Sequence, residues 1–167
     1  MIELKKYCLD TSGLSNPLEN MPEDIALYKP IWNLIKSSIE DGSFAVNDEI
    51  YQELCRLPGN IGDCLKNNKH NLLLEIGESW DWQRYIEVVE EMRNKHQNII
   101  SEYNGNRKGT VGLNDVSIVA LAKSLQLPLI SMESRSYEPS EKKIRIPGLC
   151  DLEGVEHLTF NDYLARK

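Results

Sequence analysis

Three acidic residues stand at points where an apolar segment meets a polar one, a placement that lets carboxylates act together. Asp10 follows the apolar run 7–9, Asp115 opens an apolar segment, and Glu133 follows the strand-like run 127–132. In open α/β sheets, ligands gather at the carboxyl ends of the strands. Crowded carboxylates repel one another unless a cation lies between them, so the three acids predict a site for a hard metal ion.

A fourth acid is expected from the helix that follows Val46. Glu49 and Glu53 are one helical turn apart and share a face, and Glu53 borders the apolar stripe that contains Ile50 and Leu54. Position alone also fits a structural role, because an acid after a strand is a common helix cap and the chain holds 26 acidic residues. The acids are therefore candidates as a set, and each one alone is a weak candidate.

The elements that must position these acids alternate between strand and helix. Apolar residues at three- and four-residue steps predict a helix over 24–40, with a kink or restart at Pro30, and a long helix over 80–103. Asn47 is predicted to cap the helix that ends at Pro58. The other expected elements are strands at 4–9, 43–46, 128–131 and 155–158, helices at 61–66 and 115–125, loops at 15–22 and 104–109, an extended piece at 144–147, and a last helix after the capping box of Thr159 and Asp162. This alternation predicts a parallel sheet with helices on both faces and right-handed connections.

Length and composition predict an ordinary globular chain. The 167 residues are expected to form a single domain over 1–167, and no apolar run reaches the ~20 residues that a membrane span needs. The start of the chain lacks the apolar core of a signal peptide, which favours a cytoplasmic location without membrane contact. The net charge of −7 argues against broad binding to nucleic acids, but it allows a nuclease whose metal neutralises part of the charge, and it suits a basic protein partner.

The four cysteines have no spacing that is typical of a metal site. The sequence contains no C-x-x-C pair, and its three histidines are scattered, so a structural zinc site is not predicted. Cys8 and Cys150 are expected to be buried thiols that behave as small apolar side chains.

The order of the acids resembles that of the PIN-domain nucleases. That family places an Asp after the first strand, a Glu in an early helix, an Asp at the start of a central helix and a last acid after the next strand. The matching motifs here are Leu9-Asp10-Thr11-Ser12, Val46 to Leu54, Asn114 to Ala122, and Leu129 to Glu133. Within the PIN-like proteins, the chain resembles a subgroup described as a domain of unknown function, the DUF4411 type. Like that subgroup, it has Glu as its last acid and a tail of the kind found at 143–150.

This resemblance implies a PIN-like three-layer α/β/α fold with a central parallel sheet. It implies an endoribonuclease in which a metal-activated water attacks an RNA phosphodiester in line. It also implies the toxin of a toxin–antitoxin pair, with a cognate antitoxin protein as partner, and a homodimer is compatible with it. The acids that would be catalytic and would hold one or two Mg²⁺ or Mn²⁺ ions are Asp10, Glu53, Asp115 and Glu133. The supporting hydroxyls would be those of Thr11, Ser12 and Ser131.

Two segments depart from the subgroup pattern. Val116-Ser117 stands where members often have Pro-Trp after the Asp, and Ser131-Met132 stands where they have Thr-His before the Glu. All four acids are nevertheless retained.

Other functions are compatible with parts of the pattern. A phosphatase that uses Asp10 as nucleophile needs a second Asp at the position of Ser12, and a receiver domain needs paired early acids and a late lysine after a strand. From a different class, a non-catalytic PIN-like module that binds nucleic acid or protein is the main alternative, although such modules lose some of the acids.

Overall fold

A four-stranded, fully parallel sheet forms the centre of the computed structural model, which describes residues 2–105, 110–134 and 144–167. The strands are β1 (Tyr7–Leu9), β2 (Phe44–Ala45), β3 (Leu129–Ile130) and β4 (His157–Leu158), in the order β2-β1-β3-β4. The register aligns Cys8 with Ala45 on one side and with Leu129 on the other. An isolated bridge joins Val46 to Leu73 beyond the end of β2, and another joins Ile100 to Val111. The predicted parallel sheet is confirmed.

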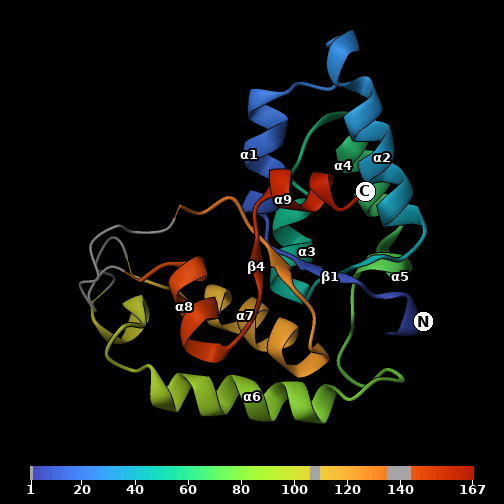
Figure 1. The fold of residues 1–167 in the computed structure, drawn as a ribbon. Helices are drawn as coiled ribbons and strands as arrows, with labels where there is room; N and C mark the ends of the chain where they lie inside the picture. Colours follow the sequence, from blue (N-terminus) through green and yellow to red (C-terminus); the bar gives the residue numbers. More distant parts are fainter. Residues whose placement is uncertain (1, 106–109, 135–143) are drawn as a thin grey trace.

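Helices cover both faces of this sheet, so the predicted three-layer α/β/α arrangement is also confirmed. In Figure 1, α6, α7 and α8 lie together on one side of the sheet, whereas α1, α2, α4 and α9 lie on the other. The described α-helices are α1 (Ser12–Asn20), α2 (Lys29–Glu40), α3 (Asp48–Leu54), α4 (Gly59–Asn67), α5 (Lys69–Leu72), α6 (Trp82–Lys95), α7 (Leu113–Leu125), α8 (Ile146–Glu153) and α9 (Phe160–Ala165). Short 3₁₀ turns occupy η1 (Ile2–Leu4), η2 (Ala26–Tyr28) and η3 (Ser101–Tyr103).

Helix α7 is central, as its composition predicted. Six of its residues in sequence positions 116–122 are buried, so the helix has almost no polar face. It packs against α6, α8 and β1, which explains why it is apolar all round. Cys8 and Cys150 are fully buried in the same core, which confirms that they are buried as expected.

The expected loop at 15–22 is wrong, because helix α1 runs through it. Pro17 lies inside the helix, and Gly13, Leu14 and Pro17 bury one of its faces. A Cβ at Gly13 would lie 2.9 Å from Leu9 Cδ1 and 3.0 Å from the Ile130 carbonyl oxygen, so glycine lets the first turn rest directly on the sheet. Burial of this face therefore outweighs the helix-breaking tendency of Pro17.

Other element boundaries differ in ways that have local causes. The strand expected at 4–9 is shortened to β1, since 2–4 forms a 3₁₀ turn and the Lys5 amine donates a 2.7 Å hydrogen bond to the Phe44 carbonyl. The expected restart at Pro30 is confirmed, because Pro30 lies in the first turn of α2. The expected strands at 43–46, 128–131 and 155–158 correspond to β2, β3 and β4.

In the second half, two predictions need correction. The helix expected over 80–103 stops at Lys95, because His96 leaves the helical conformation and its ring hydrogen-bonds Glu153 on α8. Ile146 and Pro147, expected to be extended, begin α8 with proline in the first turn. The expected capping box of Thr159 and Asp162 is confirmed, whereas part of the expected loop, 106–109, lies outside the described residues.

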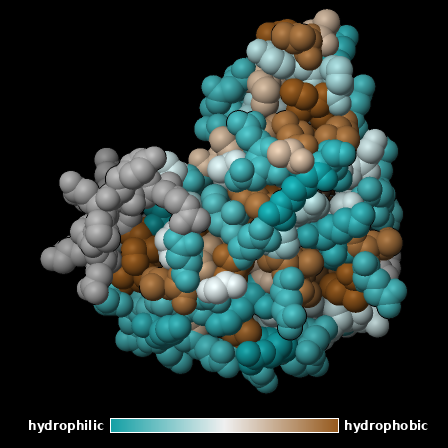
Figure 2. All heavy atoms as spheres, in the orientation of Figure 1, coloured by the Kyte–Doolittle hydropathy of each residue, from teal (hydrophilic) through white to brown (hydrophobic). Residues whose placement is uncertain are grey.

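The surface carries one projecting apolar end. Figure 2 shows apolar side chains gathered on the end of the molecule that lies between α1 and α2, where Leu27 is 79% exposed and Ile25 is 46% exposed. None of the helices within the described residues is long and apolar enough to cross a membrane.

Candidate active site

The candidate acids surround the carboxyl edge of the sheet. Because all four strands are parallel, their carboxyl ends lie at one edge of the sheet. The strand order changes direction at β1, since β2 pairs with one side of β1 and β3, followed by β4, lies on its other side. Ligands bind in open α/β sheets at this kind of switch point. Asp10 follows β1, Glu133 lies three residues beyond β3, and the Asp10 amide donates a 2.9 Å hydrogen bond to the Ile130 carbonyl.

Asp10 is buried, with 6% of its surface exposed, and a neighbouring serine fixes its carboxylate. The Ser12 amide and hydroxyl donate to Asp10 Oδ2 at 3.1 and 2.5 Å. The Ser12 oxygen in turn accepts a 3.0 Å hydrogen bond from the Met132 amide, which ties α1 to the segment after β3. Burial raises the pKa of Asp10; the Ser12 hydrogen bonds oppose this effect, and the charges of Glu133 and Glu53 add to it.

Glu53 reaches the same edge from helix α3. Asn47 accepts a hydrogen bond from the Ile50 amide and so starts this helix, as predicted. Thr11 Oγ1 donates to Glu53 Oε2 at 2.5 Å, and Asn114 Nδ2 lies 3.5 Å from Glu53 Oε1. Three chain segments therefore converge on this carboxylate.

Glu49, one turn earlier, belongs to a different part of the surface. Its side chain is exposed and lines a cavity of about 400 Å³ together with Leu74, Ile76 and Tyr85. Between the two glutamates of α3, Glu53 is therefore the one that contacts the residues after β1.

Asp115 occupies the third position of α7, and its Oδ2 atom accepts a 2.8 Å hydrogen bond from the amide of Gly112, the residue before the helix. Burial raises the pKa of Asp115 to about 7; the Gly112 hydrogen bond opposes the shift, and the charges of Glu133, Asp10 and Glu53 contribute to it. The four predicted acids are thus close enough for their charges to influence one another.

Glu133 and Ser131 are both held by partners of their own. Glu133 Oε2 accepts a 2.9 Å hydrogen bond from the Ile146 amide at the start of α8. The Ser131 hydroxyl is fully buried and lies 2.7 Å from Nε2 of His157 on β4. The Ser131 side chain therefore joins the end of β3 to β4.

The donor chemistry of this edge fits a hard divalent cation. Burial and the neighbouring carboxylates raise the pKa of Asp10 and Asp115, and a positive charge among the four acids would oppose that rise. Within residues 2–105, 110–134 and 144–167, however, no three His, Cys, Asp or Glu side chains are oriented to hold one ion. In the described structure the four carboxylates accept the internal hydrogen bonds given above.

Sequence reasoning missed two polar participants at this edge. Asn114 contacts Glu53, and the only sequence signal for it is its position next to Asp115. His157 contacts Ser131 from β4, and nothing in its sequence surroundings indicates this pairing.

Comparison with known families places nearly the whole chain in one group. Residues 7–167 match the family model described as a domain of unknown function, DUF4411. The chain belongs to the DUF4411 family. No curated protein matches it significantly. All four candidate acids lie within the DUF4411 match.

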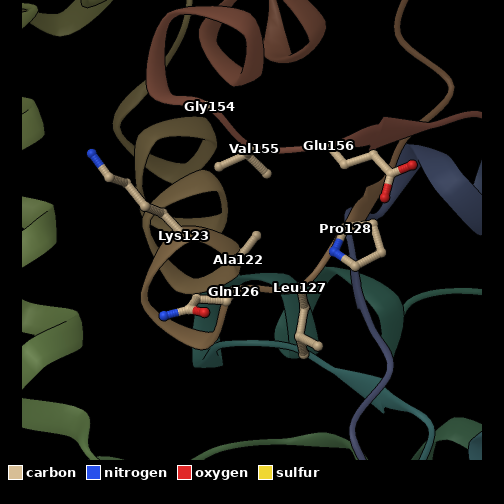
Figure 3. Close-up of a pocket in the computed structure, with 8 residues that line it drawn as sticks. All are labelled: Ala122, Lys123, Gln126, Leu127, Pro128, Gly154, Val155 and Glu156. Carbon is tan, nitrogen blue, oxygen red and sulfur yellow. The ribbon is translucent and has the colours of Figure 1, made fainter.

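A second hollow lies at the opposite edge of the sheet. The cavity in Figure 3 has a volume of about 240 Å³, and its lining includes Pro128 before β3 and Glu156 before β4. It is therefore at the amino ends of these strands, away from the acid edge of this DUF4411 protein.

Proposed function

We propose that this chain is a metal-dependent endoribonuclease of the PIN-like type. One observation carries the proposal: carboxylates from four separate segments lie at the carboxyl edge of a parallel sheet, where burial and then the neighbouring acids raise the pKa of Asp10 and Asp115. Carboxylates that repel one another have a clear function if the four acids bind a cation, because the cation would neutralise their charges.

The residues that would hold Mg²⁺ or Mn²⁺ are Asp10, Glu53, Asp115 and Glu133. When bound, such an ion supplies charge neutralisation and activates water for in-line attack on a phosphodiester. Ser12 keeps the Asp10 carboxylate in one orientation, and Thr11 does the same for Glu53. These two hydroxyls thus support the acids directly.

The biological role follows the resemblance to PIN-domain nucleases. We propose RNA as the substrate and a toxin role with a cognate antitoxin protein, with a homodimer as a compatible assembly. A small DNA-binding protein encoded by the neighbouring gene would support the toxin role.

A cleavage assay tests the enzymatic proposal. Purified protein is incubated with a mixed pool of RNAs in Mg²⁺, in Mn²⁺ and in EDTA. Cleavage is expected only with the metals, and it should fall by at least about 100-fold in Asp10→Asn, since removing one key electrostatic group commonly has an effect of this size.

Paired variants on helix α3 provide a matched control. Glu53→Gln should abolish cleavage, whereas Glu49→Gln should retain most of it, because only Glu53 contacts Thr11 and Asn114. Equal loss in both variants would contradict the assignment of Glu53, and metal-independent cleavage that survives Asp10→Asn would contradict the proposed site.

One observation favours the alternative of a non-catalytic binding module. Each of the four carboxylates accepts a hydrogen bond from a nearby donor in the chain, so each also has a structural role. That alternative predicts RNA or protein binding without cleavage, with an affinity that Asp10→Asn leaves unchanged.

A further inference from the structure

Glu133 connects two parts of the molecule that are separate in sequence. Its Oε2 atom accepts a 2.9 Å hydrogen bond from the amide of Ile146, the first residue of α8. Its charge also acts on Asp10 and Asp115 across the sheet edge. The same carboxylate therefore contacts a helix start and acts electrostatically on two other members of the acid cluster, defined here as Asp10, Glu53, Asp115 and Glu133.

The first turn of α8 needs an acceptor from outside. The first N–H groups of a helix have no acceptor within that helix. In α8, the N–H group of Ile146 donates a hydrogen bond to the carboxylate of Glu133. Pro147 has no N–H, and Leu149 donates to the Arg145 carbonyl within the helix at 3.0 Å. A negative charge at this end is also favourable for the helix dipole. Glu133 is thus the cap of α8, supplied from the segment after β3.

A continuous polar path joins this cap to the acid cluster. Met132, next to Glu133, donates its amide proton to the Ser12 hydroxyl oxygen, and that hydroxyl donates to Asp10. A change in the position of Asp10 is thereby coupled to the backbone that carries Glu133.

The far end of α8 is fixed independently. Glu153, in the last turn, is nearly completely buried and bonds Lys123 on α7 and His96 after α6. Ile146 and Leu149 are fully buried between these elements. Of these two anchoring carboxylates of α8, Glu133 is therefore the one that belongs to the acid cluster.

We propose that Glu133 couples the acid cluster to helix α8, giving one carboxylate oxygen to the first turn of α8 while the other serves the cation held by the cluster. The coupling rests on the proposed function, because it assumes that the cluster binds a cation. Binding fixes the Glu133 side chain and so stabilises the start of α8. It also gives a reason for glutamate here, since the longer side chain reaches both the helix and the cluster.

Amide hydrogen exchange of metal-free protein tests the cap by itself. In Glu133→Ala, exchange of the first amides of α8 should be about 5- to 10-fold faster than in wild type, the size expected for losing a helix cap. Glu133→Asp should behave similarly because it is too short, and Glu133→Gln, which keeps an acceptor oxygen, should show a smaller effect. Far-UV circular dichroism checks that each variant is folded.

Glu23 offers a matched control away from the acid cluster. Its Oε2 accepts a 3.2 Å hydrogen bond from the Ile61 amide in the first turn of α4, so it is also a cap supplied from outside the helix. Glu23→Ala should speed exchange at the start of α4 and leave α8 unchanged.

Added Mn²⁺ tests the coupling. In wild type, Mn²⁺ should slow exchange at the start of α8 by about threefold or more, by stabilising the state that binds it, and should leave α4 unaffected. In Glu133→Ala the slowing should disappear, and calorimetry should show weaker Mn²⁺ binding.

The outcomes separate this coupling from the proposed function. If Mn²⁺ binds wild type but exchange in α8 does not change, becomes faster, or slows equally in Glu133→Ala, the coupling is wrong and the metal site stands. If calorimetry detects no Mn²⁺ binding, the proposed metal site fails and the coupling fails with it. Unchanged exchange in metal-free Glu133→Ala would overturn the capping role as well.

Discussion

At the scale of single residues, Asp115 shows opposing influences most clearly. Its carboxylate accepts the Gly112 amide hydrogen bond that starts α7, which favours the charged form. Burial and the neighbouring acids outweigh that bond and raise its pKa to about 7. Folding therefore disfavours the ionised form of the residue that caps the central helix.

This predicts a pH-dependent stability for the metal-free protein. Because the pKa of Asp115 is raised from its unfolded value of 3.8 to about 7, its stabilising contribution is complete below pH ~4 and is lost as pH rises to about 7. Urea unfolding in EDTA should show wild type losing on the order of 1–4 kcal/mol across this window from Asp115 alone.

Asp115→Asn isolates that contribution, because an amide oxygen can still accept the Gly112 bond. The variant should be more stable than wild type at pH 7.5, with the difference shrinking toward pH 4. The same pH dependence of stability in wild type and Asp115→Asn would show that ionising this carboxylate does not destabilise the folded protein.

The sequence predicts some contacts of single residues but cannot predict others. Asp10 and Asp115 lie at element ends that can be read from apolar runs, so their convergence follows once the sheet is parallel. The bond from Glu133 to Ile146 and that from Ser131 to His157 depend on packing between elements distant in sequence. Hydrophobic periodicity carries no information on such pairs.

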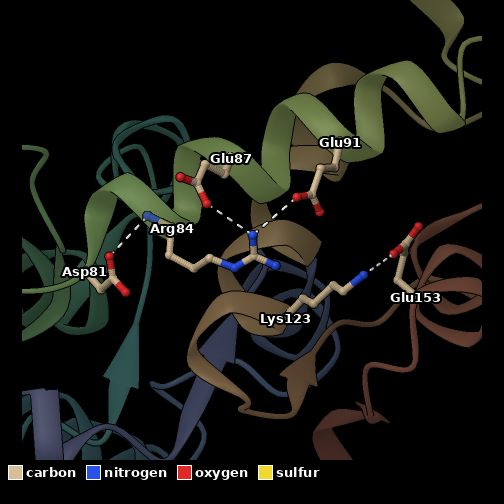
Figure 4. A network of polar contacts seen from close by, with 6 residues as sticks. All are labelled: Asp81, Arg84, Glu87, Glu91, Lys123 and Glu153. Carbon is tan, nitrogen blue, oxygen red and sulfur yellow. Dashed lines mark hydrogen bonds and ion pairs between the residues drawn. The ribbon is translucent and has the colours of Figure 1, made fainter.

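At the scale of elements, Glu153 holds α6, α7 and α8 together. Its side chain is 1% exposed, and it lies 2.6 Å from the Lys123 amine and 2.5 Å from His96 Nε2, with Lys95 at 3.2 Å. Burial alone would raise its pKa, but hydrogen bonds from Lys123, His96 and Lys95 dominate and lower it to about 2. Figure 4 shows the Lys123–Glu153 pair near the exposed ion pairs of Arg84 on α6.

Removing this carboxylate should destabilise the helical layer. Glu153→Gln is expected to lower the free energy of unfolding by about 1.5–3 kcal/mol at pH 7, because the buried carboxylate loses its charge-assisted hydrogen bonds with Lys123 and His96. Since the pKa of Glu153 is lowered, the loss should be present above pH ~4.5 and should diminish as pH falls toward 2. Chemical unfolding at pH 7 and pH 3 measures both values.

The exposed pair on α6 supplies the comparison. Glu87 is 64% exposed at its side chain, and Glu87→Gln should change stability by less than about 0.5 kcal/mol. A similar loss in both variants would mean that burial does not determine the strength of these ion pairs.

Element types could be predicted better than element ends. The apolar run of α7 and the caps at Asn47 and Thr159 identify their elements because the signal is local. Helix α1 was missed because its stability comes from Gly13 resting on the sheet, a contact that no local pattern reveals. The end of α6 at Lys95 was missed because His96 turns out of the helix toward Glu153.

At the scale of the whole molecule, the net charge of −7 makes cation binding a question of stability as well as chemistry. If the acid cluster binds Mn²⁺, the melting temperature should rise with Mn²⁺ concentration. The free energy of unfolding should increase by about 2.7 kcal/mol when Mn²⁺ is at 100 times its dissociation constant. Calorimetry and thermal unfolding should both show a sharply weakened response in Asp115→Asn, whereas Glu49→Gln should respond like wild type. Equal Mn²⁺ responses in Asp115→Asn and wild type would exclude Asp115 as a ligand.

The strand order determines when the central sheet can be completed during synthesis of the chain. Strand β1 is made early, yet Cys8 pairs with Ala45 on one side and must await Leu129 on the other. At translation rates of about 5–20 residues per second, roughly 6–24 s separate the synthesis of Cys8 from that of Leu129. Until β3 leaves the ribosome, β1 keeps an open edge and Asp10 has no Glu133 beside it. The acid edge is therefore completed late, and a nascent chain that stalls just before β3 carries the first three acids without Glu133.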